Sequence, residues 1–63
     1  MIILNGESCE KTDTLLALLS EKNYRIDRIA VEINGVIIKK ADYEKTTLND
    51  GDKIEVVSFV GGG

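Results

Sequence analysis

The C-terminal segment SFVGGG offers the clearest chemistry in this sequence, because it ends in the carboxyl group of Gly63. Since glycine has no Cβ atom, Gly61, Gly62 and Gly63 can enter a channel too narrow for other residues. The Gly63 carboxylate is a poor electrophile at neutral pH and needs activation. A partner that binds ATP with Mg²⁺ would let it attack the α-phosphate and form an acyl-adenylate, which a sulfur or nitrogen nucleophile then opens. The segment therefore indicates a protein substrate or carrier.

The other residue types offer little catalytic chemistry. The chain has no histidine and a single cysteine, Cys9, so it lacks the usual general base and an ordinary zinc ligand set. The acidic residues around Gly51 lack the later glutamate of a calcium loop and indicate a turn. With no histidine nearby, and with Glu7 and Glu10 as neighbours, we do not expect Cys9 to be a reactive thiol, and we interpret it as a small, partly buried strand residue. We expect no catalytic residue, no metal site and no cofactor bound by this chain.

The composition is that of one small soluble domain. The chain has 63 residues, a net charge of -3 and a pI near 4.7, which argues against nucleic-acid binding. No apolar run approaches the roughly 20 residues of a membrane span, and the first residues do not resemble a signal peptide. With one cysteine, no internal disulfide can form. We expect a cytoplasmic protein that is a monomer when alone.

Two Asn-Gly pairs, Asn5-Gly6 and Asn34-Gly35, predict two β-hairpins. Tight hairpin turns need positive φ at both central residues, which asparagine and glycine tolerate best. The expected strand pairs are 1–4 with 7–10, and 29–33 with 36–40.

A helix and a last strand complete the expected fold. Leucines at 15, 16, 18 and 19 recur at helical spacing within segment 11–23, with Thr12 or Asp13 as N-cap and Asn23 as stop. After an irregular stretch with a short helical turn, the β-branched segment 53–60 predicts a strand. The economical arrangement is an α+β fold, a single sheet of about five strands covered on one face by one helix.

Strand alternation assigns one parity to the core and leaves Ile3, Val57 and Phe59 on the open face, together with glutamates. If these three residues cluster, they form an apolar patch that leads to the glycine tail, although accidental exposure is the alternative. From Phe59 to Gly63 the extended chain reaches at most about 17 Å. Ordering each residue after Phe59 costs about 1 to 2 kcal/mol, so contacts of the folded body must offset this cost. The candidate docking residues are Phe59, Val57, Ile3 and Val60.

Several motifs carry a resemblance to a known family. The start MIILNGES, the helix TLLALL, the hairpin NGVII, the strand DGDKIEVV and the end VGGG resemble the ThiS family, sulfur carrier proteins of thiamine biosynthesis. The resemblance covers the whole chain and implies a ubiquitin-like β-grasp fold with the first and last strands side by side. It implies a domain over residues 1–60 followed by a flexible glycine tail at 61–63.

The resemblance also implies a mechanism. An E1-like adenylating enzyme (ThiF-like) uses ATP and Mg to adenylate Gly63, and a cysteine desulfurase provides the sulfur that turns it into a thiocarboxylate. The thiocarboxylate donates sulfur to a thiazole synthase (ThiG-like), and Gly62 is the other half of the diglycine. Two alternatives stay open: a carrier resembling the molybdopterin synthase small subunit, and a ubiquitin-like interaction module with an idle tail.

Overall fold

The computed structural model describes residues 1–59. Its elements, in chain order, are β1 (Ile2–Leu4), β2 (Glu7–Cys9), α1 (Leu15–Glu21), the 3-10 turn η1 (Ile26–Arg28), β3 (Ile29–Ile33), β4 (Val36–Ile38), the 3-10 turn η2 (Lys40–Asp42) and β5 (Lys53–Ser58).

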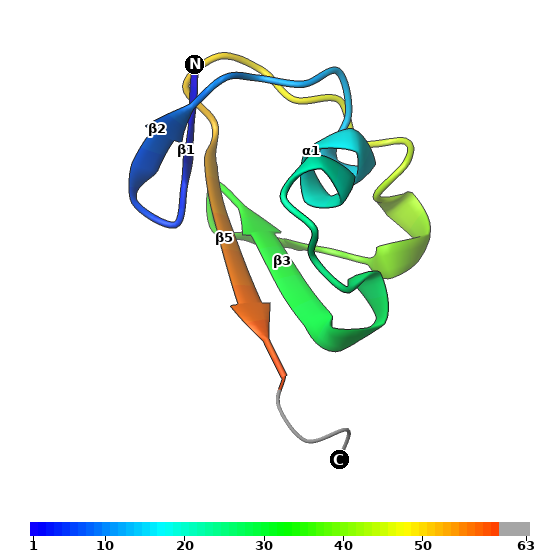
Figure 1. The fold of residues 1–63 in the computed structure, drawn as a ribbon. Coiled ribbons are helices and arrows are strands. Elements are labelled where there is room, and N and C mark those ends of the chain that lie inside the picture. The colour runs from blue at the N-terminus through cyan, green and yellow to red at the C-terminus, as the bar shows by residue number, and fades with distance from the viewer. Residues whose placement is uncertain (60–63) are drawn as a thin grey trace.

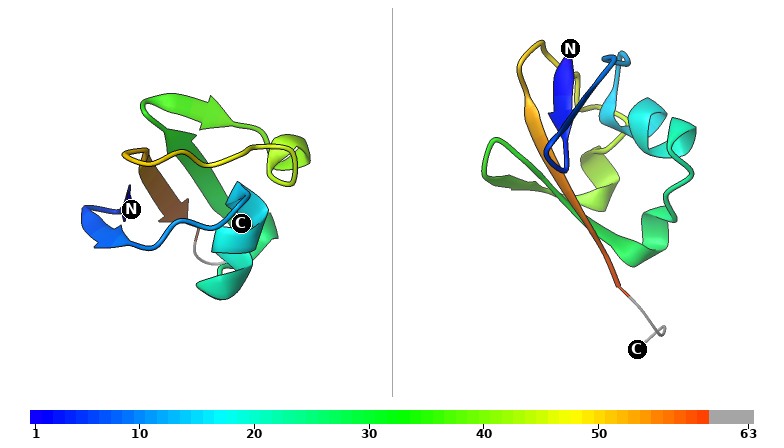
Figure 2. Two further views of the ribbon diagram at one scale, coloured as in Figure 1. Left: turned by 90° about the horizontal axis from the view of Figure 1, so that it is seen from above. Right: turned by 60° about the vertical axis from the view of Figure 1, so that its left-hand side comes forward.

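The five strands form one mixed sheet in the order β2-β1-β5-β3-β4. The last strand, β5, lies at the centre, parallel to β1 and antiparallel to β3. Helix α1 covers one face of the sheet, as Figure 1 and both views of Figure 2 show. This arrangement confirms the expected α+β class and is the topology of the β-grasp fold. No helix within residues 1–59 is long and apolar enough to cross a membrane.

Both predicted Asn-Gly turns form in the structure. Asn5 and Asn34 have φ angles of 49° and 52°, and the glycine after each has a φ of 85°. These left-handed angles suit asparagine and glycine, which explains why each hairpin reverses where the sequence indicates. Most strands are shorter than expected: β2 ends at Cys9, β4 ends at Ile38 and β5 ends at Ser58, whereas β3 has the expected bounds.

The helix begins later than expected and has a different cap. Thr14 is the N-cap, and its hydroxyl accepts a hydrogen bond from the Ala17 N–H at 3.2 Å. The predicted caps, Thr12 and Asp13, precede this position, and the Thr12 hydroxyl donates to the Thr14 carbonyl instead. The stop was predicted correctly, because Asn23 has a left-handed φ of 63°.

The core lies between α1 and the covered face of the sheet. Alternating residues of β3 and β5 enter it, and so do leucines from successive turns of α1. Its buried residues are Ile2, Leu15, Leu18, Leu19, Ile29, Val31, Ile33, Tyr43, Leu48, Ile54 and Val56.

Candidate functional site

The candidate site starts where β5 ends, at the opposite end of the molecule from the N-terminus (Figure 1). β1 pairs only with the start of β5, whereas β3 pairs with it as far as Ser58, and the Phe59 N–H donates to the Arg28 carbonyl at 2.7 Å. Four predicted residues of the site, Val60 and the three glycines after it, lie outside the described residues. The described part of the site is therefore the base of the tail.

Two of the predicted docking residues share one end of the open face. Val57 is 58% exposed and Phe59 is 57% exposed, and they are two positions apart in the chain. Side chains two apart on an extended strand point to the same face. Val57 also lies opposite the exposed Ala30 of β3. The open face thus carries a small apolar surface directly before the tail.

Ile3 lies apart from these two residues. It pairs with Lys53 at the start of β5, four positions before Val57, and four strand residues span about 13 Å. Glu55 lies between them on the open face, and Ile3 is itself only partly exposed. The structure therefore does not extend the surface formed by Val57 and Phe59 to Ile3.

Sequence reasoning did not single out Ile37, the most exposed large hydrophobic residue of the described chain. Ile37 is 72% exposed on β4 and lies opposite Glu32 of β3. The available signal was the Asn34-Gly35 turn, because hairpin pairing fixes which residue of β4 faces each residue of β3. The exposed residues Glu32 and Glu55 are also direct neighbours, on β3 and β5.

A comparison with family models decides the family. The model of the ThiS family matches residues 2–63.

The chain belongs to the ThiS family. The sulfur carrier protein ThiS of Bacillus subtilis is 39% identical over 66 aligned positions, which cover 100% of both chains. The crystal structure of the thiamine biosynthesis protein ThiS from Geobacter metallireducens matches with a TM-score of 0.77 and 30% identity, over 98% of this chain and 97% of that one. This membership makes the chain a ThiS-like sulfur carrier, a small carrier protein instead of a catalyst.

A third relative is a larger protein. The thiazole synthase of Paramagnetospirillum magneticum is 41% identical over 98% of this chain, but the match covers only 20% of the synthase. That synthase therefore contains a ThiS-like segment in the same polypeptide.

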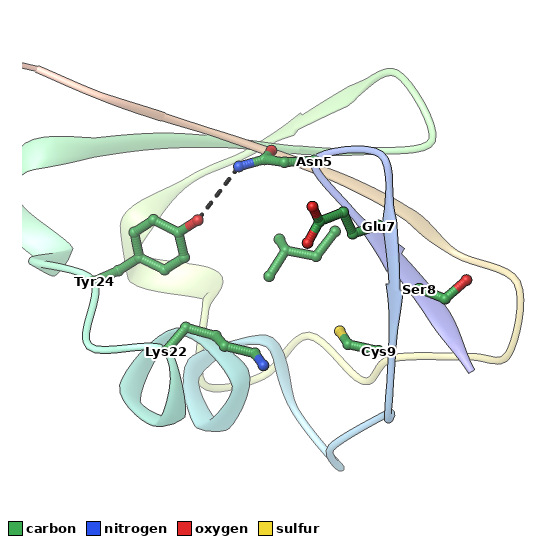
Figure 3. A pocket seen from close by; sticks show the side chains of 7 residues that line it. Asn5, Glu7, Ser8, Cys9, Lys22 and Tyr24 are labelled. Carbon is green, nitrogen blue, oxygen red and sulfur yellow. Dashed lines mark hydrogen bonds between the residues drawn. The ribbon is translucent and has the colours of Figure 1, made fainter.

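Cys9, the single cysteine of this ThiS-family chain, lines a pocket at the opposite edge of the sheet from β4. Its sulfur points into the pocket and the Lys22 side chain extends toward it, while the Asn5 amide donates to the Tyr24 hydroxyl across the far side (Figure 3). Cys9 is partly buried at the end of β2, as predicted. The pocket has a volume of about 390 Å³.

Two described side chains have displaced pKa values, and both lie away from the base of the tail. A hydrogen bond from the N-terminal ammonium group, at 2.8 Å, lowers the pKa of the Asp50 carboxyl group. Burial raises the pKa of the Tyr43 hydroxyl, because the phenolate is poorly solvated in the core. Within residues 1–59, no group of three or more His, Cys, Asp or Glu side chains is placed to hold a metal ion.

Proposed function

We propose that this chain carries sulfur for thiamine biosynthesis as a thiocarboxylate on Gly63. The observation that carries the proposal is the full-length match to the ThiS family, which extends through the terminal glycines to residue 63. The Geobacter relative, which is named a thiamine biosynthesis protein, favours this pathway over the molybdopterin alternative.

The fold suits this role because it presents the tail from a rigid base. β3 pairs with β5 as far as Ser58, and the Phe59 N–H donates to the Arg28 carbonyl, so the last described residues of the strand have a fixed direction. Apart from residues 60–63, which the structure does not describe, the domain offers a partner the small apolar surface of Val57 and Phe59. Contacts with such a surface can offset the entropy of ordering the tail in a partner's active site.

The chemistry proceeds in two steps on the Gly63 carboxyl group. An E1-like enzyme binds ATP with Mg²⁺, the carboxylate attacks the α-phosphate, and pyrophosphate leaves. In the second step, the terminal sulfur of a persulfide formed by a cysteine desulfurase attacks the acyl carbon and displaces AMP, and a thiol, such as that of free cysteine, then reduces the acyl disulfide and releases the thiocarboxylate. The resulting thiocarboxylate donates its sulfur to thiazole formation. We also propose a cytoplasmic location, where ATP for this activation is available.

The proposed partner that receives the sulfur is a thiazole synthase. The ThiS-like segment within the Paramagnetospirillum thiazole synthase supports this choice, because a shared polypeptide keeps the carrier-like segment close to the synthase.

Mass spectrometry of the intact protein tests the proposal. The full chain is incubated with an E1-like enzyme, ATP, Mg²⁺, a cysteine desulfurase and cysteine. We expect one C-terminal oxygen to be replaced by sulfur, and we expect no replacement when ATP is omitted.

A chain that lacks Gly62 and Gly63 is the matched control, since the domain is unchanged and only the reacting group is removed. We expect this variant to form no thiocarboxylate and to support no thiazole formation. Thiazole formation at the normal rate with the truncated chain would rule out the proposed function, and retained partner binding alone would favour the interaction module.

A further inference from the structure

A groove beside the base of the tail has no role in the proposed chemistry. It lies between the end of β5 and the segment that joins α1 to β3, and it has a volume of about 320 Å³. The structure places it next to the exit of the tail, because Ser58 pairs with Ile29 and the Phe59 N–H donates to the Arg28 carbonyl at 2.7 Å. We call it the arginine groove; its lining residues are Asn23, Tyr24, Arg25, Arg28, Ile29, Ser58 and Phe59.

The arginine groove is positively charged although the chain as a whole carries a net charge of -3. Arg25 and Arg28 are its charged lining residues, and no carboxylate of residues 1–59 lines it. Asp27 lies between them in η1, but no ion pair within residues 1–59 involves either guanidinium group. A planar guanidinium group can bind a carboxylate through two parallel hydrogen bonds. The groove is thus equipped to bind acidic side chains.

The same groove has an apolar wall. Phe59 is 57% exposed there, and the backbone beside it is fixed by the hydrogen bond to Arg28. Arginine and aromatic residues are enriched at the centres of protein interfaces, where a few such residues provide most of the binding free energy. This combination favours a protein partner that presents a carboxylate next to an apolar side chain.

The length of the tail brings this groove against any protein that acts on Gly63. From Phe59 to Gly63 the extended chain reaches at most about 17 Å. A partner that holds the Gly63 carboxyl group in its active site therefore has its surface close to Phe59. Because Phe59 is part of the arginine groove, that surface also faces Arg25 and Arg28.

We propose that the arginine groove docks an acidic segment of thiazole synthase, at the mouth of the channel that receives the glycine tail. This inference rests on the proposed function and adds to it the surface and the charge by which the acceptor recognises the carrier. Thiazole synthase is the partner because a relative joins a ThiS-like segment to a thiazole synthase in one chain.

Reversal of both charges tests the proposal. The Arg25→Glu, Arg28→Glu double variant of the full chain is titrated against the purified thiazole synthase of the same organism. We expect the Kd to rise on the order of 10- to 100-fold, because two attractive contacts become repulsive. The wild-type affinity should fall as salt is raised, whereas the affinity of the variant should change less.

The matched control is the Lys11→Glu, Lys45→Glu double variant, which changes the net charge equally at two exposed positions outside the groove. We expect its Kd to stay within about threefold of wild type. Equal losses of affinity in both variants, or none in the arginine variant, would overturn the proposal. If the charge reversal unfolds the domain, Arg25→Gln with Arg28→Gln replaces it, with a smaller expected loss.

The same protein samples separate this inference from the proposed function. In one outcome, the wild-type chain forms the thiocarboxylate while the arginine variant binds thiazole synthase with normal affinity. This result would refute docking at the arginine groove but would not contradict the proposed function. Wild-type chain that is never modified at Gly63 would refute the function itself.

Discussion

At the scale of single residues, the open face of the sheet carries an unfavourable contact. Glu32 and Glu55 lie directly opposite each other on β3 and β5, and both are exposed. Like charges in such a pair destabilise a sheet. The described residues include no ion pair that would neutralise either glutamate. This pair is therefore a place where the stability of the domain can be raised.

We predict that Glu55→Lys stabilises the domain by about 0.2 to 1 kcal/mol, because it replaces a repulsive pair with an attractive one. Urea denaturation at low salt measures the effect, and the gain should shrink at high salt. Glu44→Lys makes the same charge change at an exposed position outside the sheet and should have little effect. An equal gain in the free energy of unfolding in Glu44→Lys would show that the change in net charge, and not the pair of glutamates, causes the stabilisation.

The buried Tyr43 makes the stability of the domain depend on pH in the alkaline range. It is 3% exposed, and burial raises the pKa of its hydroxyl above the ordinary value of 10.0. Above about pH 10 the unfolded chain loses the Tyr43 proton more readily than the folded chain. The folded state then holds more protons, so the free energy of unfolding falls as pH rises further.

We predict that Tyr43→Phe removes this part of the alkaline loss of stability. Urea denaturation of both proteins at about pH 7 and about pH 11 measures it, and the fall between the two values should be smaller for the variant. Lysine titration contributes equally to both proteins and cancels in the difference. An identical fall in the free energy of unfolding in both proteins would show that the Tyr43 hydroxyl ionises equally readily in the folded and unfolded states.

At the scale of elements, both hairpin turns are fastened to β5 by their asparagine side chains. The Asn5 amide oxygen accepts from the Val56 N–H at 2.8 Å, and its nitrogen donates to the Val56 carbonyl at 3.3 Å. The Asn34 amide oxygen accepts from the Lys53 N–H at 3.0 Å. Each asparagine therefore both forms its turn and holds the strand that carries the tail.

We predict that Asn5→Gly lowers the free energy of unfolding by about 1 to 3 kcal/mol, because it leaves polar groups of Val56 without their partners. Glycine keeps the left-handed angle but adds entropy to the unfolded chain, so the loss in excess of that in a matched Asn→Gly control measures the contribution of the amide. Asn23→Gly is the matched control, since Asn23 has a similar φ of 63° and should change stability by less than about 0.5 kcal/mol. Faster hydrogen exchange of the Val56 amide in Asn5→Gly would show that the stability is lost at the contact between Asn5 and Val56. Unchanged exchange at Val56 would contradict this explanation.

At the scale of the whole molecule, we expect the folded domain to provide stability and the C-terminal segment to provide the reactive group. The buried residues of the described chain lie between Ile2 and Val56, before the last residues of β5. Sulfur chemistry is proposed for Gly63, beyond the described residues. Stability and reactivity are thus expected to respond to changes in different parts of the chain.

We predict that removal of residues 60–63 changes the free energy of unfolding by less than about 0.5 kcal/mol, because the core is left intact. Thermal or urea denaturation of the shortened and full chains measures the difference. The shortened chain should also fail to form a thiocarboxylate. A loss of stability well above this value would show that residues 60–63 contribute to the fold.

The sequence by itself determined the features that depend on a few neighbouring residues. Asn5-Gly6 and Asn34-Gly35 specified both turns, because positive φ is a local property of these residue types. Alternation in β3 specified its buried face for the same reason, since successive side chains of a strand point to opposite sides. The motifs of the whole chain also indicated the family that the comparisons established.

Only the tertiary structure decided which distant residues meet. The parallel register of β1 and β5 placed Ile3 beside Lys53, away from Val57. The passage of the segment before β3 along the end of β5 brought two arginines next to Phe59. Strand alternation assigns each residue to a face but leaves its neighbour on the next strand open, because packing of the whole core fixes the register.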